Sequence, residues 1–110
     1  MQSAKKFGVL VLIEGAMLLC SWDAYAARGT VVHKMSGCDY FMVQSGRLYD
    51  LLERYGGHDP DKDDVLVGKF ESYGMADIYD ETADEELKVW VEDYALTRTD
   101  ALEKLADKCE

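Results

Sequence analysis

The sequence predicts a small, mainly β (α+β) domain, a five-stranded barrel or curled antiparallel sheet with one C-terminal amphipathic helix docked on it. Short apolar runs recur between turns rich in glycine, serine and aspartate, which is typical of small antiparallel sheets. One stretch near the C-terminus repeats apolar residues at helical spacing. The chain has 110 residues, with one Pro and nine Gly. This length and composition fit one globular domain, and the chain is too short for several domains.

The charge balance is strongly acidic. Asp and Glu total 22 against 12 Lys and Arg, so the formal net charge is -10. Nucleic-acid binding needs clustered cations that face phosphates, and anionic membrane surfaces attract cations for the same reason. The composition therefore argues against both of these partners.

Residues 1–26 have the pattern of a secretory signal peptide. Two lysines precede an apolar run over residues 7–20, and an Ala-Tyr-Ala triplet ends at Ala26, as small-x-small triplets do before a cleavage site. The run is shorter than the about 18 apolar residues that a membrane-spanning helix needs. We therefore expect cleavage after Ala26 and a secreted or periplasmic chain with no membrane insertion afterwards.

Two residues complicate this interpretation. Glu14 places a carboxylate inside the apolar run, which opposes insertion. Cys20 offers an alternative as a lipid-attached cysteine, but the residue before it is Leu19, where lipoprotein processing needs a small side chain. We favour the cleaved signal peptide.

Cleavage would leave two cysteines, Cys38 and Cys109. In an oxidising compartment, two cysteines in a short domain most simply form a disulfide bond. This bond would close residues 38–110 as a single small domain, and the chain-entropy model gives about 4 kcal/mol of stabilisation for a loop of about 70 residues. A metal pair is disfavoured, because there is no C-x-x-C motif and because His33 and His58 lack a matching ligand spacing.

The apolar runs predict the strands in order. Residues 27–37 contain two glycines and are expected to form a flexible N-terminal arm, whose residues 30–32 offer an edge strand. The further predicted strands cover residues 40–43, 65–70, 75–79 and 87–91, with an acidic loop over residues 80–86. Alternation in the last strand puts Trp90 on the face opposite to its aliphatic side chains.

Residues 47–55 allow two interpretations. Their apolar side chains fit a helical spacing, and the two glycines that follow would terminate such a helix. Tyr49 and Leu51 also share one face of an alternating strand. Ser45 and Gly46 are typical of a two-residue hairpin connection, and a helix starting there would lack a good N-cap. We favour the strand.

The C-terminal helix is the clearest element. Thr97 is a candidate N-cap, with Asp100 three residues later. An apolar stripe follows at helical spacing, formed by Ala101, Leu102, Leu105, Ala106 and Cys109. Because Cys109 shares this stripe, the helix would dock on the sheet with its end beside Cys38. In outline, five strands and a terminal helix resemble an OB-like or SH3-like barrel.

The aspartates after residue 58 offer a weak metal candidate. Asp59, Asp61 and Asp63 stand at alternate positions, as the first three ligands of an EF-hand loop do. The sixth position is Asp64 where glycine is needed, and the twelfth is Phe70 where a bidentate glutamate is needed. We therefore predict no metal site and no other cofactor.

Catalytic motifs are not recognisable in the sequence. It has no phosphate-binding loop, and no Cys-His or Ser-His-Asp grouping can be assigned. His33 in the expected arm and His58 in a polar loop are expected to be solvated. We therefore predict that the protein is not an enzyme.

Aromatic side chains give the one functional indication. They are numerous for a small domain, and strand alternation forces some of them outward, where a ring among carboxylates suits a cationic protein segment or a sugar. Trp90 and Tyr73 are the candidate ligand-binding residues. The predicted function is an exported, non-catalytic binding module that recognises another protein through an acidic surface. The alternatives are an oligosaccharide-binding module and a weak calcium-binding loop protein.

Overall fold

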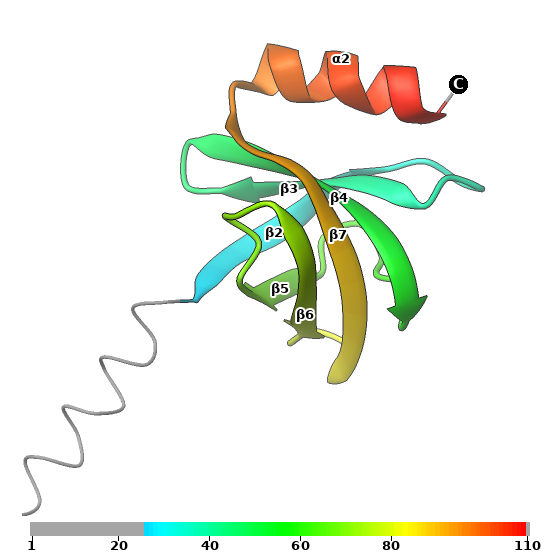
Figure 1. Ribbon diagram of the computed structural model, residues 1–110. Coiled ribbons are helices and arrows are strands. Elements are labelled where there is room, and N and C mark those ends of the chain that lie inside the picture. The colour runs from blue at the N-terminus through cyan, green and yellow to red at the C-terminus, as the bar shows by residue number, and fades with distance from the viewer. Residues whose placement is uncertain (1–25, 110) are drawn as a thin grey trace, which may run out of the picture.

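The structure is a computed structural model that describes residues 26–109 (Figure 1). Six antiparallel strands form a closed barrel in the order β2, β3, β4, β7, β6, β5, and one helix follows the last strand. The elements are β2 (Ala27–Lys34), β3 (Tyr40–Ser45), β4 (Leu48–Gly57), β5 (Val65–Gly68), β6 (Gly74–Asp80), β7 (Glu85–Leu96) and α2 (Arg98–Cys109). The predicted mainly β barrel with a docked C-terminal helix is confirmed.

The predicted signal peptide lies outside the described residues, apart from Ala26. Within residues 26–109, the structure contains no helix that is long and apolar enough to cross a membrane.

The barrel has six strands and not five, because the segment expected to be a flexible arm contains β2. This strand pairs with β3 on one side and with β5 on the other, and Val31 is fully buried in the barrel core. Glycine content suggested mobility for residues 27–37, but a Cβ atom on Gly29 would overlap Val43 and the carbonyl oxygen of Gln44. This glycine therefore permits close packing of β2 on β3.

Strands β3 and β4 are buried on both faces. Three of their side chains enter the barrel core, namely Phe41, Val43 and Leu52. Met42 and Leu51 point the other way and pack under α2 against Ala101 and Leu105. The strand interpretation of residues 47–55 is therefore confirmed. Adjacent buried leucines on opposite faces explain why the same residues also fit a helical spacing.

The β3–β4 hairpin turns one residue later than expected. Ser45 pairs with Leu48, so Gly46 and Arg47 form the two-residue connection that we had placed at Ser45 and Gly46. Gly46 has a φ of +66°, a backbone conformation that glycine adopts without strain.

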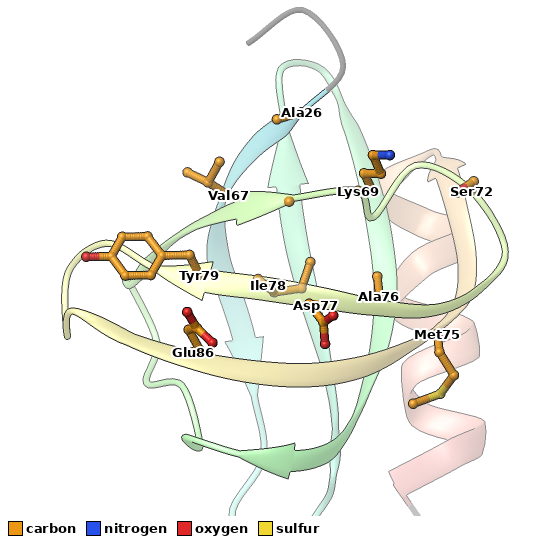
Figure 2. Close-up of a pocket in the computed structure, with 11 residues that line it drawn as sticks. Ala26, Val67, Lys69, Ser72, Met75, Ala76, Asp77, Ile78, Tyr79 and Glu86 are labelled. Atoms are coloured by element: carbon orange, nitrogen blue, oxygen red, sulfur yellow. The ribbon is translucent and has the colours of Figure 1, made fainter. Parts of the chain in front are cut away.

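Strands β6 and β7 are buried on one face only. Ile78, Leu87, Val89 and Val91 point into the barrel core, whereas Trp90 lies on the outer face, as predicted. Figure 2 shows the side chains of Met75, Asp77 and Tyr79 along β6. β7 extends well beyond the predicted residues 87–91, because it pairs with β6 and, through register shifts, with β4.

Gly68 ends β5 at a close approach to β6. A Cβ atom at this position would overlap the Ile78 side chain and come within 3.0 Å of the Asp77 carbonyl oxygen. After this point the chain leaves the ladder, and Phe70 inserts into the barrel core. Glycine at this position therefore permits close packing of β5 on β6.

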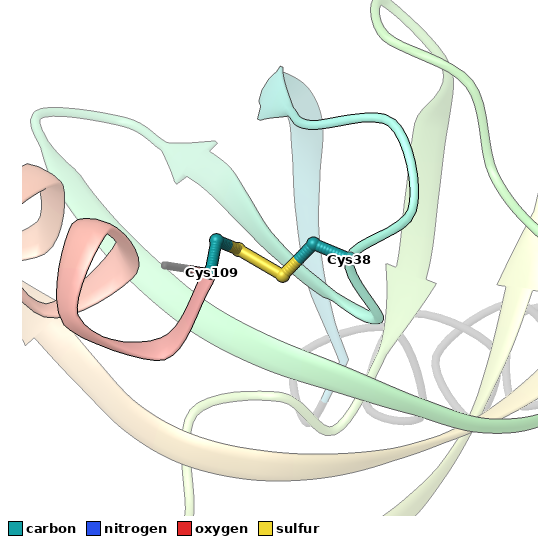
Figure 3. The surroundings of a disulfide bond; sticks show 2 residues. All are labelled: Cys38 and Cys109. Carbon is teal, nitrogen blue, oxygen red and sulfur yellow. A yellow bond between two sulfur atoms is a disulfide. The ribbon is translucent and has the colours of Figure 1, made fainter.

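The helix α2 starts and ends as predicted. The Thr97 hydroxyl accepts a hydrogen bond of 3.2 Å from the Asp100 N–H, and its carbonyl accepts one of 2.9 Å from the Ala101 N–H. Thr97 is therefore the N-cap. At the other end, Cys109 forms a disulfide bond with Cys38 in the β2–β3 connection, with 5.5 Å between their Cα atoms (Figure 3). The predicted pairing is confirmed, and it is compatible with an oxidising compartment.

Asp50 is a buried carboxyl group beside the chain that leads from β7 into α2. Its Oδ1 accepts a hydrogen bond of 2.9 Å from the Ala95 N–H, and Ala95 has a left-handed backbone with a φ of +57°. This bond supports the turn toward α2. Within residues 26–109, Asp50 Oδ2 has no hydrogen-bond partner. Burial raises the pKa of Asp50 to about 6, against the opposing effect of the Ala95 N–H.

Removing the disulfide bond is expected to lower the free energy of unfolding by about 4 kcal/mol. The two cysteines are 71 residues apart, so their bond restricts most of the unfolded chain. Urea unfolding of the double variant Cys38→Ser/Cys109→Ser measures this loss. A reductant should weaken the wild type to a similar extent and leave the double variant unchanged. Equal stability of variant and wild type would contradict the expectation.

Asp50→Asn is expected to flatten part of the pH dependence of stability. The ordinary pKa of this group is 3.8, and in the folded chain it is about 6. Below about pH 4 the carboxyl is protonated in both the folded and the unfolded chain, and its contribution to the free energy of unfolding is fully present. As the pH rises through 6 this contribution is lost, because the unfolded chain releases its proton at a lower pH than the folded chain does. The loss is on the order of 3 kcal/mol.

Urea unfolding of the wild type and of Asp50→Asn at about pH 4 and about pH 7.5 measures this difference. The same substitution at Asp107, an exposed residue of α2, is the control and should keep the profile of the wild type. If the Asp50→Asn profile also runs parallel to the wild type, the buried carboxyl does not titrate in this way.

Candidate functional site

The two predicted ligand-binding residues lie near the same end of the β6–β7 ladder but have different neighbours. Trp90 is 38% exposed and is paired across the ladder with Met75, which is 46% exposed. Tyr73 is 67% exposed, and its ring meets Tyr94 edge to face, with 4.8 Å between centroids. Its hydroxyl donates a 3.2 Å hydrogen bond to Asp93 Oδ1, which raises the pKa of Tyr73.

Trp90 belongs to a wider surface on the outside of the barrel. Three cross-strand pairs connect β6 and β7 there, and direct partners on one face of an antiparallel ladder have their side chains next to each other. We call this surface the β6–β7 face. It is formed by the pairs Met75 and Trp90, Asp77 and Lys88, and Tyr79 and Glu86. Glu53 on β4 is the next partner of Trp90 and extends the row.

A hollow of about 1030 Å³ runs along part of this face, over β5 and β6 (Figure 2). Its lining includes the apolar side chains of Val67, Met75 and Tyr79 together with the carboxylates of Asp77 and Glu86. Lys69 and Ser72 also line the hollow. The hollow therefore offers apolar contact area and negative charge side by side.

The charges on the β6–β7 face are partly fixed by neighbours. Lys88 Nζ lies 2.9 Å from Asp77 Oδ1, so this lysine is already paired, although both side chains are exposed. The Tyr79 hydroxyl donates a hydrogen bond to Asp84, and this bond raises the pKa of Tyr79. Tyr79 is thereby held as a neutral phenol beside carboxylates.

A second grouping lies at the end of the barrel where β4 leaves and β6 meets β7. His58 follows β4, Asp64 precedes β5, and Asp80 ends β6. Backbone hydrogen bonds fix these segments, since the His58 N–H donates to the Glu86 carbonyl at 3.1 Å and the Val31 N–H donates to the Asp64 carbonyl at 2.9 Å. We call His58, Asp64 and Asp80 the histidine–aspartate cluster.

The side chains of the histidine–aspartate cluster point at one another. His58 Nε2 lies 3.1 Å from Asp80 Oδ2 and 3.8 Å from Asp64 Oδ2. One ligand atom from each of the three residues lies within 4.8 Å of the others. Asp80 is fully buried and Asp64 nearly so, while the His58 side chain is 17% exposed. Within residues 26–109, this is the one group with metal-ligand spacing.

The cluster concentrates negative charge in a buried place. Within residues 26–109, His58 is the only basic side chain within 4 Å of the Asp64 and Asp80 carboxylates. Burial raises the pKa of Asp64, and its hydrogen bond with Asp80 raises it further, against the smaller opposing effects of the Asp61 N–H and His58. A hydrogen bond between two carboxyl groups needs a proton on one of them, so Asp64 and Asp80 hold one proton between them beside the imidazole.

The weak calcium candidates occupy different surroundings. Asp59 is exposed and forms an ion pair of 2.5 Å with Lys34, and the side chains of Asp61 and Asp63 are exposed. The described part of the chain does not gather these three into a ligand group. Asp61 contributes only its backbone N–H, which donates to Asp64 Oδ2 at 3.1 Å.

The cluster was missed because its members come from three separate segments. His58 was expected to be solvated, but its side chain is only 17% exposed and lies against Asp80 at the end of β6. Asp64 stood in a run of acidic residues with nothing to single it out. One signal was available for Asp80, which shares the inward face of β6 with Ile78 by alternation. An inward carboxyl group at a strand end requires a partner.

Trp90→Ala is expected to cost at most about 1 kcal/mol of stability, because an outward side chain loses only cross-strand contacts. Leu52→Ala is the matched core substitution and is expected to cost about 2–5 kcal/mol, because Leu52 is fully buried in the barrel. Urea unfolding measures both. Losses of equal size would mean that Trp90 is part of the core and not of an accessible surface.

Comparisons of the chain with protein-family models, with curated proteins and with solved structures find no match.

Proposed function

We propose that this protein is an exported, non-catalytic binding module that recognises a cationic segment of another protein through the β6–β7 face. The observation that supports this most is the hollow along the face, where exposed Met75 and Tyr79 alternate with the carboxylates of Asp77 and Glu86. Arginine and lysine stems pack on apolar side chains while their charged ends reach carboxylates. A guanidinium group also stacks on an indole ring such as that of Trp90.

The net charge favours a cationic partner over an anionic one. A chain with a formal charge of -10 attracts cationic segments over distances longer than direct contact and speeds their encounter. An exposed tryptophan then provides an anchor, since tryptophan is enriched among the residues that carry most of the binding energy at protein interfaces. The overall charge would steer the partner, and Trp90 would hold it.

The proposed location is secreted or periplasmic. It is supported by the signal-peptide pattern of residues 1–26 and by the disulfide bond between Cys38 and Cys109, which is compatible with an oxidising compartment. The natural partner would then be another envelope or extracellular protein.

Oligosaccharide recognition is the alternative for the same surface. It is favoured by the position of Trp90 beside Met75 and Glu53, which places a ring for stacking next to a hydrogen-bond acceptor. Trp90 is the only tryptophan within residues 26–109, so its fluorescence would report a bound neutral sugar. A response to neutral oligosaccharides that added salt leaves unchanged would favour this alternative over a cationic peptide.

Binding of a dye-labelled peptide of alternating arginine and serine, followed by fluorescence anisotropy, tests the proposal. Raising the salt from about 50 to about 500 mM should weaken binding at least about tenfold, because exposed charges are screened. Trp90→Ala should weaken it at low salt. Leu48→Ala is the matched control, since Leu48 is an exposed apolar residue on the β3–β4 hairpin. Salt-insensitive binding, or equal effects of both substitutions, would count against the proposal.

A further inference from the structure

We propose that the histidine–aspartate cluster binds one divalent transition-metal ion, with zinc as the best fit, through His58 Nε2 and one carboxylate oxygen each of Asp64 and Asp80. This inference is independent of the β6–β7 face. It rests on the distances within the cluster, on the groups that orient its side chains, and on its charge.

The distances match the spacing of ligands around a small metal ion. Zinc binds imidazole nitrogen and carboxylate oxygen at about 2.0–2.2 Å, and two such ligands at a tetrahedral angle lie about 3.3–3.5 Å apart. The two distances from His58 Nε2, 3.1 Å to Asp80 Oδ2 and 3.8 Å to Asp64 Oδ2, bracket this value. Small side-chain rotations would therefore bring all three atoms to bonding distance.

Each ligand side chain is also held by a partner outside the cluster. The Ala83 N–H donates to Asp80 Oδ1 at 3.0 Å, which leaves Asp80 Oδ2 for an ion. Asp64 Oδ2 receives the Asp61 N–H. His58 Nδ1 lies 3.7 Å from Glu85 Oε2, so a small rotation would let this carboxylate accept a hydrogen bond from Nδ1–H and favour the tautomer whose Nε2 is unprotonated. Metal-binding histidines generally have such a partner on the other ring nitrogen.

The charge of the cluster calls for a cation of more than one unit. Two buried carboxylates face one imidazole, and Glu85 adds a third carboxylate at the exposed edge, where its side chain is 60% exposed. The hydrogen bond between Asp64 and Asp80 needs a proton on one of them, and a divalent ion would displace this proton and compensate both carboxylates together.

The donor set distinguishes between metals. Calcium and magnesium take oxygen ligands almost exclusively, so a site centred on an imidazole nitrogen does not suit them. One nitrogen and two carboxylate oxygens suit zinc, whose four-coordinate sites often leave a position for water. Such an ion would join the β4–β5 loop to the end of β6 and would clamp this end of the barrel.

Zinc titrated into the purified, EDTA-treated protein at about pH 7.5 tests the proposal by calorimetry. We expect saturable binding of one ion per chain. His58→Gln and Asp64→Asn should each weaken it more than about 100-fold, because they remove a ligand. Glu85→Gln should weaken it about tenfold, because it removes only the group that orients the ring. The matched controls, His33→Gln and Asp61→Asn, should bind as the wild type does.

The imidazole nitrogen resonances of the unsubstituted protein give a second readout that does not depend on the folding of any variant. The sequence contains two histidines, so zinc should shift the Nε2 resonance of His58 and leave His33 unchanged. No saturable binding below about 1 mM zinc would refute the site. So would a shift confined to His33, or an affinity that survives both His58→Gln and Asp64→Asn in folded protein, since the ion would then bind elsewhere.

Discussion

The burial of β3 and β4 on both of their faces is the constraint on which the rest of the structure depends. The barrel interior needs one set of their side chains, and the opposite set, Met42 and Leu51, would face water without α2. Burying an aliphatic or methionine side chain contributes about 1.5–3 kcal/mol. Three local features help to keep α2 on this surface. They are the Thr97 cap, the hydrogen bond that the Ala95 N–H donates to Asp50, and the disulfide bond.

The two faces of strand β7 have different roles, one in the barrel core and one on the outer surface. Its inward side chains complete the core, and its outward ones form half of the β6–β7 face. The histidine–aspartate cluster lies at the end of the barrel where β7 begins, whereas α2 follows the end of the same strand. Strand β7 thus runs from the end of the barrel that contains the histidine–aspartate cluster to the end that α2 follows. The β6–β7 face, the proposed recognition surface, lies on the outside of the barrel between these two ends.

Sequence patterns predicted the features that depend on the spacing of nearby residues, and the cysteine count predicted the disulfide bond. The capped helix after Thr97, the outward position of Trp90 and the pairing of the two cysteines follow from local spacing and cysteine counting. Strand β2 was anticipated only as an edge strand over residues 30–32, because its full length depends on ladders with β3 and β5, which lie further along the chain. The cluster of His58, Asp64 and Asp80 was hidden for the same reason, since only the closed barrel brings its three segments together.

The position of the disulfide bond has a consequence for biosynthesis. Cys38 lies between β2 and β3, the first and second elements to emerge from the ribosome counting from residue 26, and Cys109 ends a helix that follows β7. The covalent link can therefore form only after all the strands and α2 have been synthesised. A chain that stops short of α2 lacks Cys109 and cannot form this disulfide bond.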